Sequence, residues 1–298
     1  MRVLLTHTTR LQYSSEVVEG VMDVRVGPFS DAHQRWEHFD LRVAPHAAIR
    51  SYTDGFGNAA HLITNARPHR SVELVSTGDV QTLLRDPFAQ PDRPPRPLGP
   101  AELADYLAPS PLVPTHPSLQ ALAAEFKPEQ SADAFEAARG LMERVYLDFT
   151  YRKDVTTVAT TVGEVLASRV GVCQDFAHVL IGLYRVVGIP ARYVSGYIVQ
   201  GSDARLQRRA SDAQREDQPA RQGQAPDRGA GASHAWVEAF TVTHGWRGFD
   251  PTNNLVASEY HVKMAIGRDY GDVPPTRGTF RGVADEQLSV NVTTRVVE

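Results

Sequence analysis

A run of prolines divides this chain of 298 residues, because ten of its twenty prolines lie between Pro87 and Pro117. Proline fixes φ and has no backbone N–H to donate, so this density prevents both a continuous helix and a central strand. We therefore expect an extended connector over 86–117, with room for only a short helix at 101–107. The connector separates a first part, 1–85, from a second part, 118–298.

The first part has the pattern of a β-rich domain. Segments 21–26 and 71–75 have strand length and many β-branched residues, and the sequence Asp-Gly-Phe-Gly-Asn at 54–58 places two glycines in a turn. No long segment with helical periodicity interrupts this region. We expect a small antiparallel β-sandwich over 1–85.

The second part mixes helices with strands, so the predicted fold class is α+β. Apolar residues recur at helical spacing over 118–148 and again from Val172 to Val187, where Gly188 and Pro190 predict the helix end. Strands are expected at 191–199, 234–242, 246–250 and 288–297. Segment 201–231 is rich in arginine, glycine and glutamine and has one large apolar residue, Leu206, so we expect a mobile polar insertion there.

The composition argues against several kinds of partner. A net charge of −4 and an isoelectric point near 6.3 give no reason to expect nucleic acid. No run of about 18 apolar residues occurs, and the start of the chain resembles a first strand, so we expect no membrane association and a cytoplasmic location. His33, His38, His61 and His69 lack metal-ligand spacing with acids and are interpreted as surface residues; we expect no metal and no cofactor.

Cys173 is the one cysteine of the chain, which rules out a disulfide within it and makes a thiolate zinc site unexpected. It stands at the expected start of a helix, just after Gly171. A helix N-terminus favours the thiolate, which is the nucleophilic form, and its free N–H groups can stabilise an oxyanion. The alternative is a buried structural cysteine, which is the commoner case for a lone thiol.

His234 and Asp250 are the candidate partners of this thiol. His234 begins a strand that continues through Trp236, and Asp250 ends the next strand, so a hairpin could bring imidazole and carboxylate together. The alternatives are a surface or core histidine and an aspartate that forms a turn before Pro251. Together with the cysteine, the order Cys, His, Asp suits a thiolate nucleophile with a base and an orienting acid.

Four sequence blocks carry a resemblance to a known family: Gly171–His178, Gly188–Tyr197, His234–Glu238 and Phe249–Asn253. They resemble the bacterial transglutaminase-like superfamily. The segments His7–Arg10, 54–58 and Gly267–Pro275 also fit it. The resemblance implies a papain-like catalytic domain whose cysteine helix packs on an antiparallel sheet, preceded by a β-rich domain, and it assigns the triad to Cys173, His234 and Asp250. The insertion at 201–231 departs from the compact hairpin of the family.

The resulting functional prediction is cysteine-dependent acyl transfer on peptide or amide bonds of a peptide or protein substrate, with hydrolysis as the expected outcome. Protein-glutamine transamidation and a non-catalytic peptide-binding scaffold are the alternatives. Asp175, Trp236, Asn253 and Tyr151 are supporting candidates. Helical geometry points Asp175 away from Cys173, so a capping role at the helix start is favoured over a direct catalytic one.

Overall fold

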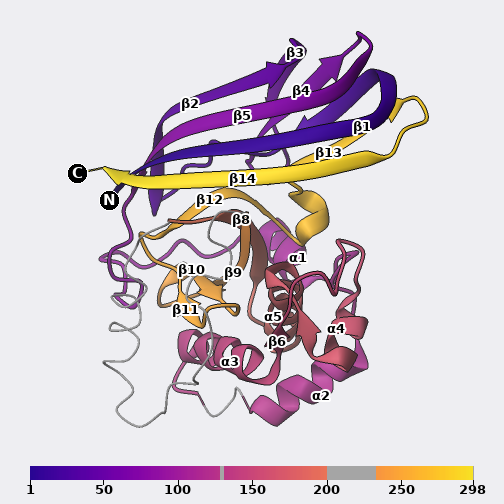
Figure 1. The fold of residues 1–298 in the computed structure, drawn as a ribbon. Coiled ribbons are helices and arrows are strands. Elements are labelled where there is room, and N and C mark those ends of the chain that lie inside the picture. The colour runs from indigo at the N-terminus through magenta and orange to yellow at the C-terminus, as the bar shows by residue number, and fades with distance from the viewer. Residues whose placement is uncertain (128–130, 200–232, 298) are drawn as a thin grey trace.

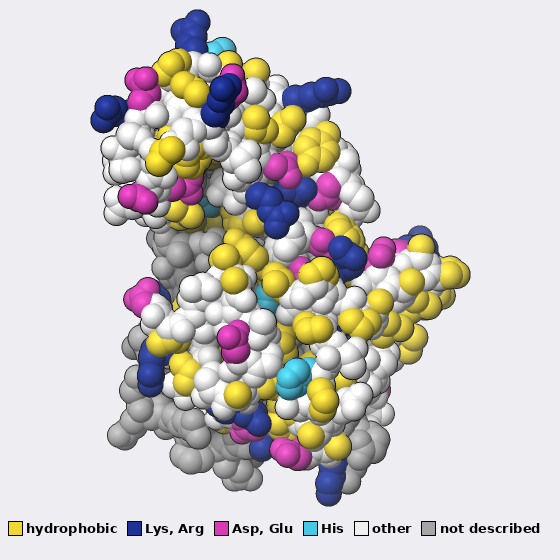
Figure 2. Space-filling model, turned by 90° about the vertical axis from the view of Figure 1, so that its right-hand side faces the viewer, with side chains coloured by type: hydrophobic (Ala, Val, Ile, Leu, Met, Phe, Trp, Pro, Cys, Tyr) yellow, Lys and Arg dark blue, Asp and Glu magenta, His cyan; other side chains and the backbone are white. Residues whose placement is uncertain are grey.

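The computed structural model describes residues 1–127, 131–199 and 233–297. The chain forms a β-rich part and a part with helices and a second sheet, which lie one above the other in Figure 1. The space-filling view shows a narrower waist between them (Figure 2). The predicted insertion at 201–231 lies outside the described residues. Among those residues, no helix combines the length and the apolar character needed to cross a membrane.

The β-rich part is organised around one long strand. Strand β1 (Arg2–Val24) pairs through its first half with two strands and through its second half with two others. The neighbours are β5 (His69–Thr82) and β14 (Glu286–Val297), then β4 (Ala59–Asn65) and β13 (Thr276–Arg281), with β2 (Gln34–Ala44) beside β5 and β3 (Ala48–Thr53) beside β4. All of these pairs are antiparallel, which confirms the expected sandwich.

Alternation along β1 explains how it shapes this core. Val3, Leu5 and Leu11 point inward at a period of two, and all three are buried. The β1–β5 register then shifts between Gln12 and Val17, where the strand passes from one layer to the other. One continuous strand therefore contributes to both layers.

The C-terminal strands return to this first part of the chain. Strand β14 pairs with β1 in unbroken register from Arg2 opposite Val297 to Tyr13 opposite Glu286, so the two chain ends lie side by side (Figure 1). The sequence boundary 118–298 therefore includes a segment, 276–297, that belongs structurally to the β-rich part. Alternation predicts a strand at 288–297, but it contains no information about which distant strand is the partner.

The second part is a five-stranded antiparallel sheet with helix α5 (Cys173–Val186) packed on it. The strand order is β11 (Leu255–Val256), β10 (Gly245–Asp250), β9 (His234–Thr241), β8 (Ala191–Ile198) and β12 (His261–Gly267). Ala235, Val237 and Ala239 of β9 share a buried apolar cluster with the helix. This is the predicted arrangement of a cysteine helix on an antiparallel sheet.

Helices from the middle of the chain surround α5. They are α2 (Pro117–Phe126), α3 (Ala134–Asp148) and α4 (Val162–Ser168). The helical pattern at 118–148 thus corresponds to two helices, and the short helix expected in the connector is α1 (Pro100–Leu107). The start of the connector is held in place, because Arg247 donates hydrogen bonds to the carbonyl oxygens of Pro87, at 3.1 Å, and Ala89, at 3.0 Å.

Two side-chain amides join the β-rich part to the edge strand β12. Gln34 donates to the carbonyl oxygen of Lys263 and accepts from its N–H, each at 2.8 Å. Asn58 makes the same two bonds, each at 2.8 Å, with Ile266. Because each amide supplies the donor and acceptor of a missing neighbouring strand, the free edge of β12 is satisfied by the other part of the molecule.

Candidate active site

Cys173 is the first residue of α5 and remains partly accessible. The residue before it, Val172, has an extended backbone with φ −112° and ψ −176°. A short strand, β7 (Val170–Gly171), leads into this junction and pairs in parallel with β6 (Thr150–Tyr151). The strand, the turn and the helix start therefore fix the position of the thiol at the positive end of the helix dipole.

Asp175 holds this junction together. Its Oδ2 atom accepts hydrogen bonds from the Val172 N–H at 2.8 Å and from the Thr156 hydroxyl at 2.7 Å. Gly171 is needed here because a Cβ at that position would lie 2.7 Å from the Asp175 side chain. Burial raises the pKa of Asp175, while the bonds from Val172 and Thr156 oppose this rise. These contacts support the capping role that helical geometry favours.

His234 and Asp250 form a buried pair, with 2.8 Å between His234 Nε2 and Asp250 Oδ2. The hairpin of β9 and β10 places Phe249 opposite Val237, so Asp250 reaches diagonally toward the first residue of β9. Both side chains are fully buried. Burial alone would lower the pKa of His234, but the charge and hydrogen bond of Asp250, followed by those of Cys173, raise it to about 10.

The thiol lies next to this imidazole. Cys173 is close enough to His234 to help raise the pKa of the imidazole, after the larger effect of Asp250. Because Nε2 is held by Asp250, the nitrogen left to face the sulfur is Nδ1, which makes no hydrogen bond among the described residues. The structure therefore brings together the three residues Cys173, His234 and Asp250, in the order sulfur, imidazole, carboxylate.

The carboxylate of Asp250 is fixed by its own turn. Oδ1 accepts from the N–H groups of Thr252, at 2.9 Å, and Asn253, at 3.2 Å. Oδ2 accepts from the Asn253 side chain at 2.8 Å as well as from His234. Burial would raise the pKa of Asp250, but His234 and then His261 lower it well below its usual range. Asn253 thus contacts the site, as expected of a supporting residue.

His261, on β12, is a site residue that sequence reasoning missed. Its Nε2 atom lies 3.6 Å from Asp250 Oδ2 and has no other partner among the described residues, while its Nδ1 accepts a 3.4 Å hydrogen bond from the Ser258 N–H. His261 is buried, with 5% of the residue exposed. No local motif marks this histidine, because its approach to Asp250 depends on how β12 is placed against the rest of the sheet.

Trp236 and Tyr151 contact the site less directly. Trp236 is buried, stacks on His234 with ring centroids 6.2 Å apart, and meets His261 edge-on at 5.2 Å. Tyr151 lies opposite Gly171 in the strand pair that precedes Cys173. Trp236 therefore packs against both imidazoles, and Tyr151 belongs to the support of the helix start.

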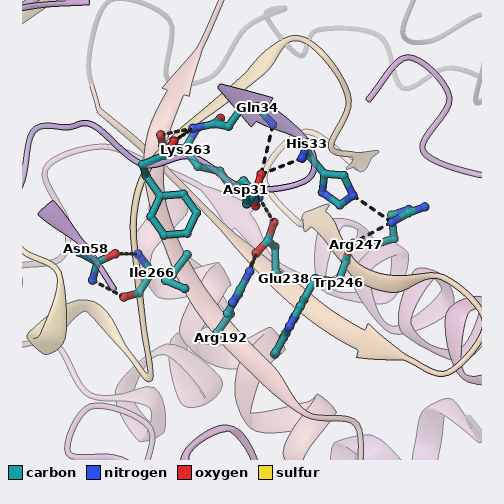
Figure 3. A network of polar contacts seen from close by, with 11 residues as sticks. Asp31, His33, Gln34, Asn58, Arg192, Glu238, Trp246, Arg247, Lys263 and Ile266 are labelled. Atoms are coloured by element: carbon teal, nitrogen blue, oxygen red, sulfur yellow. Dashed lines mark hydrogen bonds and ion pairs between the residues drawn. The ribbon is translucent and has the colours of Figure 1, made fainter. Parts of the chain in front are cut away.

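Glu238, four residues beyond His234 on β9, lies at the centre of a buried ionic network (Figure 3). It binds Arg192 at 2.6 Å and the Lys263 ammonium at 2.8 Å, and Lys263 also contacts Asp31. The potential ligand atoms of Asp31, His33 and Glu238 lie within 4.8 Å of one another, a spacing that a metal ion could use. The ammonium of Lys263 already contacts both carboxylates, so the lysine supplies the cation of this cluster.

Other histidines are placed differently from the sequence prediction. His61 and His69, interpreted as surface residues, are 6% and 7% exposed. Both lie in the β-rich part. His61 Nε2 donates to the Gly27 carbonyl oxygen, its Nδ1 lies 2.9 Å from the Ser51 hydroxyl, and the ring of His69 contacts Tyr13. The error arose because spacing with acids tests for metal ligation but not for burial.

Comparisons with known proteins agree with this geometry. The model of the transglutaminase-like superfamily matches residues 120–251, and that of the bacterial transglutaminase-like N-terminal region matches residues 3–81. The chain belongs to the transglutaminase-like superfamily. The first match contains Cys173, His234 and Asp250, and the second covers most of the β-rich part.

Relatives from mycobacteria match nearly the whole chain. An uncharacterized protein of Mycobacterium tuberculosis is 34% identical over 93% of this chain and 87% of its own, and one of Mycobacterium leprae is 27% identical over 98% of both. A crystal structure named "Putative Cysteine Protease from Cytophaga hutchinsonii" has a TM-score of 0.73 and 22% identity, covering 100% of this chain and 92% of that one. This last likeness shows the shared papain-like, transglutaminase-like fold.

Proposed function

We propose that this member of the superfamily is a cysteine hydrolase that cleaves peptide or amide bonds through Cys173, His234 and Asp250. One observation carries the proposal: a partly accessible thiol at a helix start lies next to an imidazole, and the Nε2 atom of that imidazole is 2.8 Å from a buried carboxylate. That order of groups is the arrangement required to activate a thiol for attack on an acyl carbon.

The raised pKa of His234 sets the resting state of the proposed site. With a pKa of about 10, the imidazole carries both protons at neutral pH, one directed at Asp250 and one at the sulfur. In the proposed mechanism this positive ring stabilises the thiolate form of the sulfur, which is the nucleophile. His234 then acts first as the general acid that protonates the leaving amine.

The thioester formed by this attack is the intermediate of the proposed reaction. The Cys173 backbone N–H, in the first turn of α5, would donate to the oxygen that becomes negative during attack. After the amine leaves, His234 is neutral and can take a proton from water as the water attacks the thioester. Release of the acid restores the protonated imidazole and the thiolate, so protons balance over the cycle.

We propose hydrolysis as the second half-reaction because water, at about 55 M, competes for the thioester at every turnover unless the site excludes it. An amine acceptor would give transamidation by the same acyl-enzyme. The substrate class is a peptide or protein, since the nucleophile and general acid fit an amide with an amine leaving group.

The test combines thiol labelling with product analysis. Iodoacetamide should alkylate native Cys173 at neutral pH faster than free cysteine, and His234→Ala should slow this reaction by at least tenfold. His46→Ala, at an exposed position, is the matched control and should react like the unmodified chain. Peptide libraries should be cleaved by the protein in the presence of EDTA, and Cys173→Ala should abolish cleavage.

A fluorescent primary amine added to the same reactions separates the alternatives. Amine incorporation that depends on Cys173, without cleavage, would replace hydrolysis by transamidation. Alkylation of Cys173 only after unfolding would remove the catalytic proposal and favour a peptide-binding scaffold.

A further inference from the structure

A cavity of about 90 Å³ lies in the β-rich part, at the place where β1 crosses between the two layers. Its walls come from both halves of β1, from β4 and β5, and from the C-terminal strands β13 and β14. None of Cys173, His234 and Asp250 lines it. The cavity is therefore separate from the candidate active site, and nothing in the proposed chemistry uses it.

Two buried polar side chains line this cavity with one hydrogen-bonding atom each left free. Asn65 is 3% exposed and His69 is 7% exposed. The Asn65 Nδ2 and His69 Nε2 atoms have no partner among the described residues. Buried polar atoms are usually satisfied in native proteins, so two free ones beside the same cavity indicate a ligand that completes them.

The opposite ends of both side chains are fixed, and this defines what the free ends can do. Asn65 Oδ1 accepts from the Arg67 N–H at 3.2 Å, which leaves the amide NH₂ as a free donor. His69 Nδ1 lies 2.8 Å from the Arg67 carbonyl oxygen, to which it must donate. In the tautomer that donates from Nδ1, Nε2 is a free acceptor, so Asn65 and His69 together present one donor and one acceptor.

Glycine at position 20 opens the space between these two groups. Gly20 pairs with Asn65 across β1 and β4, and a Cβ built on it would lie 3.6 Å from His69 Nε2. Aromatic and aliphatic side chains make up much of the remaining wall, and Thr276, Thr279 and Glu286 also line it. The ring of Tyr13 meets His69 edge-on at 5.8 Å and Phe280 at 4.8 Å.

We propose that this cavity binds an uncharged carboxamide carried on a short apolar group. Its carbonyl oxygen accepts from Asn65 Nδ2, its N–H donates to His69 Nε2, and its apolar end contacts Tyr13 and Phe280. A primary amide has an acceptor oxygen and a donor nitrogen on the same carbonyl carbon, which matches the free donor of Asn65 and the free acceptor of His69. A cavity of about 90 Å³ is several times the roughly 10–15 Å³ that one water molecule requires on the same measure, so a small amide or one carboxamide side chain fits and a whole peptide does not.

The experiment is a titration of the full chain, labelled with ¹⁵N in its histidine rings and observed by NMR. Butyramide should shift the His69 Nε2 resonance in a saturable way, with a dissociation constant in the millimolar range expected for so small a ligand. The isosteric ketone 2-pentanone, which lacks the N–H donor, should bind at least tenfold more weakly. N-acetylglutamine methylamide then identifies the source of the amide. Tighter binding than butyramide would indicate a glutamine side chain as the ligand, and weaker binding would indicate a free small amide. Either result supports the proposal.

A variant pair controls for the site and for folding. Gly20→Ala places a methyl group beside His69 Nε2 and should weaken butyramide binding at least tenfold, while Gly55→Ala, where a Cβ meets nothing within 4 Å, should leave it unchanged. Unchanged positions of the other histidine resonances would report an intact fold. Absence of a saturable shift, equal binding of butyramide and 2-pentanone, full binding by Gly20→Ala, or a crystal soaked in butyramide with only water between Asn65 and His69 would each overturn the proposal.

Discussion

At the scale of single residues, the protonation of His234 depends on one carboxylate. Burial favours the neutral ring, and Asp250 reverses this preference. A pKa raised from 6.5 to about 10 in the folded state means that His234 stabilises the fold fully below about pH 6.5. This contribution is lost as the pH rises through about 10. The pKa of Asp250 is lowered in the folded state. Its contribution to the stability of the fold is therefore present at pH values above the usual pKa of an aspartate and is lost as the pH falls.

Asp250→Asn should therefore move the alkaline limb of activity. Without the carboxylate charge, burial lowers the His234 pKa, so the ring loses its proton near or below neutral pH instead of near pH 10. We expect the alkaline limb of kcat/KM to shift to lower pH by several units and the rate at neutral pH to fall by about 10²-fold or more. The measurement is the pH dependence of kcat/KM and of iodoacetamide labelling.

The control for this substitution is Asp92→Asn, which changes an exposed carboxylate of the connector. It should leave both pH profiles as they are. An alkaline limb that stays in place in Asp250→Asn would contradict the role given to this carboxylate.

His261 is expected to position Asp250 without touching substrate. His261→Phe removes the 3.6 Å contact while retaining a ring against Trp236. Because His261 helps lower the pKa of Asp250, its loss should raise that pKa and move the acid limb of kcat/KM to higher pH. We expect a fall of about tenfold in kcat/KM, equivalent to about 1.4 kcal/mol of transition-state stabilisation.

Partial recovery in His261→Gln, whose amide can still donate to Asp250, would support this role. A merely structural histidine would give a lower melting temperature in His261→Phe with an unchanged acid limb, and that result would count against positioning.

At the scale of secondary structure, the local sequence pattern predicted the individual helices and strands better than it predicted which segments contact one another. The cysteine helix begins at Cys173 as expected, and the strands expected at 191–199, 234–242 and 246–250 correspond to β8, β9 and β10. A hairpin is local in sequence, so the approach of His234 to Asp250 could be foreseen. The contact of His261 with Asp250 and the pairing of β14 with β1 join distant segments, and periodicity does not encode such pairing.

Helix α5 also shows how one small residue permits close packing. Gly182 lies against α2, where a Cβ would come within 2.6 Å of a methyl carbon of Leu119, a side chain that is only 2% exposed. Gly140, in α3, has nothing within 4 Å of the same position. Both glycines carry the same entropic cost of glycine within a helix, but only Gly182 lacks room for a side chain.

Gly182→Ala should destabilise the protein although alanine favours helices. The added methyl has no room beside a buried leucine, and overpacking of this kind costs about 1–3 kcal/mol, more than the gain of about 1 kcal/mol from helix propensity. Gly140→Ala is the matched control and should be neutral or stabilising. Urea unfolding of both variants measures the difference, and greater stability in Gly182→Ala would show that α2 can move away from α5.

At the scale of the whole molecule, the two parts share an apolar cluster and a set of hydrogen bonds. Tyr197, Val262 and Met264 of the second sheet belong to the same apolar cluster as Val3 and Leu5 of β1. His7 and Tyr197 also approach to 2.5 Å between Nδ1 and the hydroxyl oxygen. The turn sequence at 54–58 therefore has a structural purpose that the sequence could not show, which is to present Asn58 to β12.

Asn58→Ala should accordingly weaken the whole molecule instead of one part. It leaves the N–H and carbonyl of Ile266 without their partner, at a cost of about 2–4 kcal/mol for two buried backbone groups. Because the parts share an apolar cluster, unfolding should remain a single transition at lower urea concentration. Circular dichroism can follow the backbone while the lone thiol of Cys173 reports the second part, and the two curves should coincide before and after the substitution. Asn291→Ala, at an exposed position of β14, should change stability by less than about 0.5 kcal/mol. If Asn58→Ala exposed the thiol at a urea concentration at which the β-rich part stayed folded, the two parts would be independent units and the shared apolar cluster would not couple them.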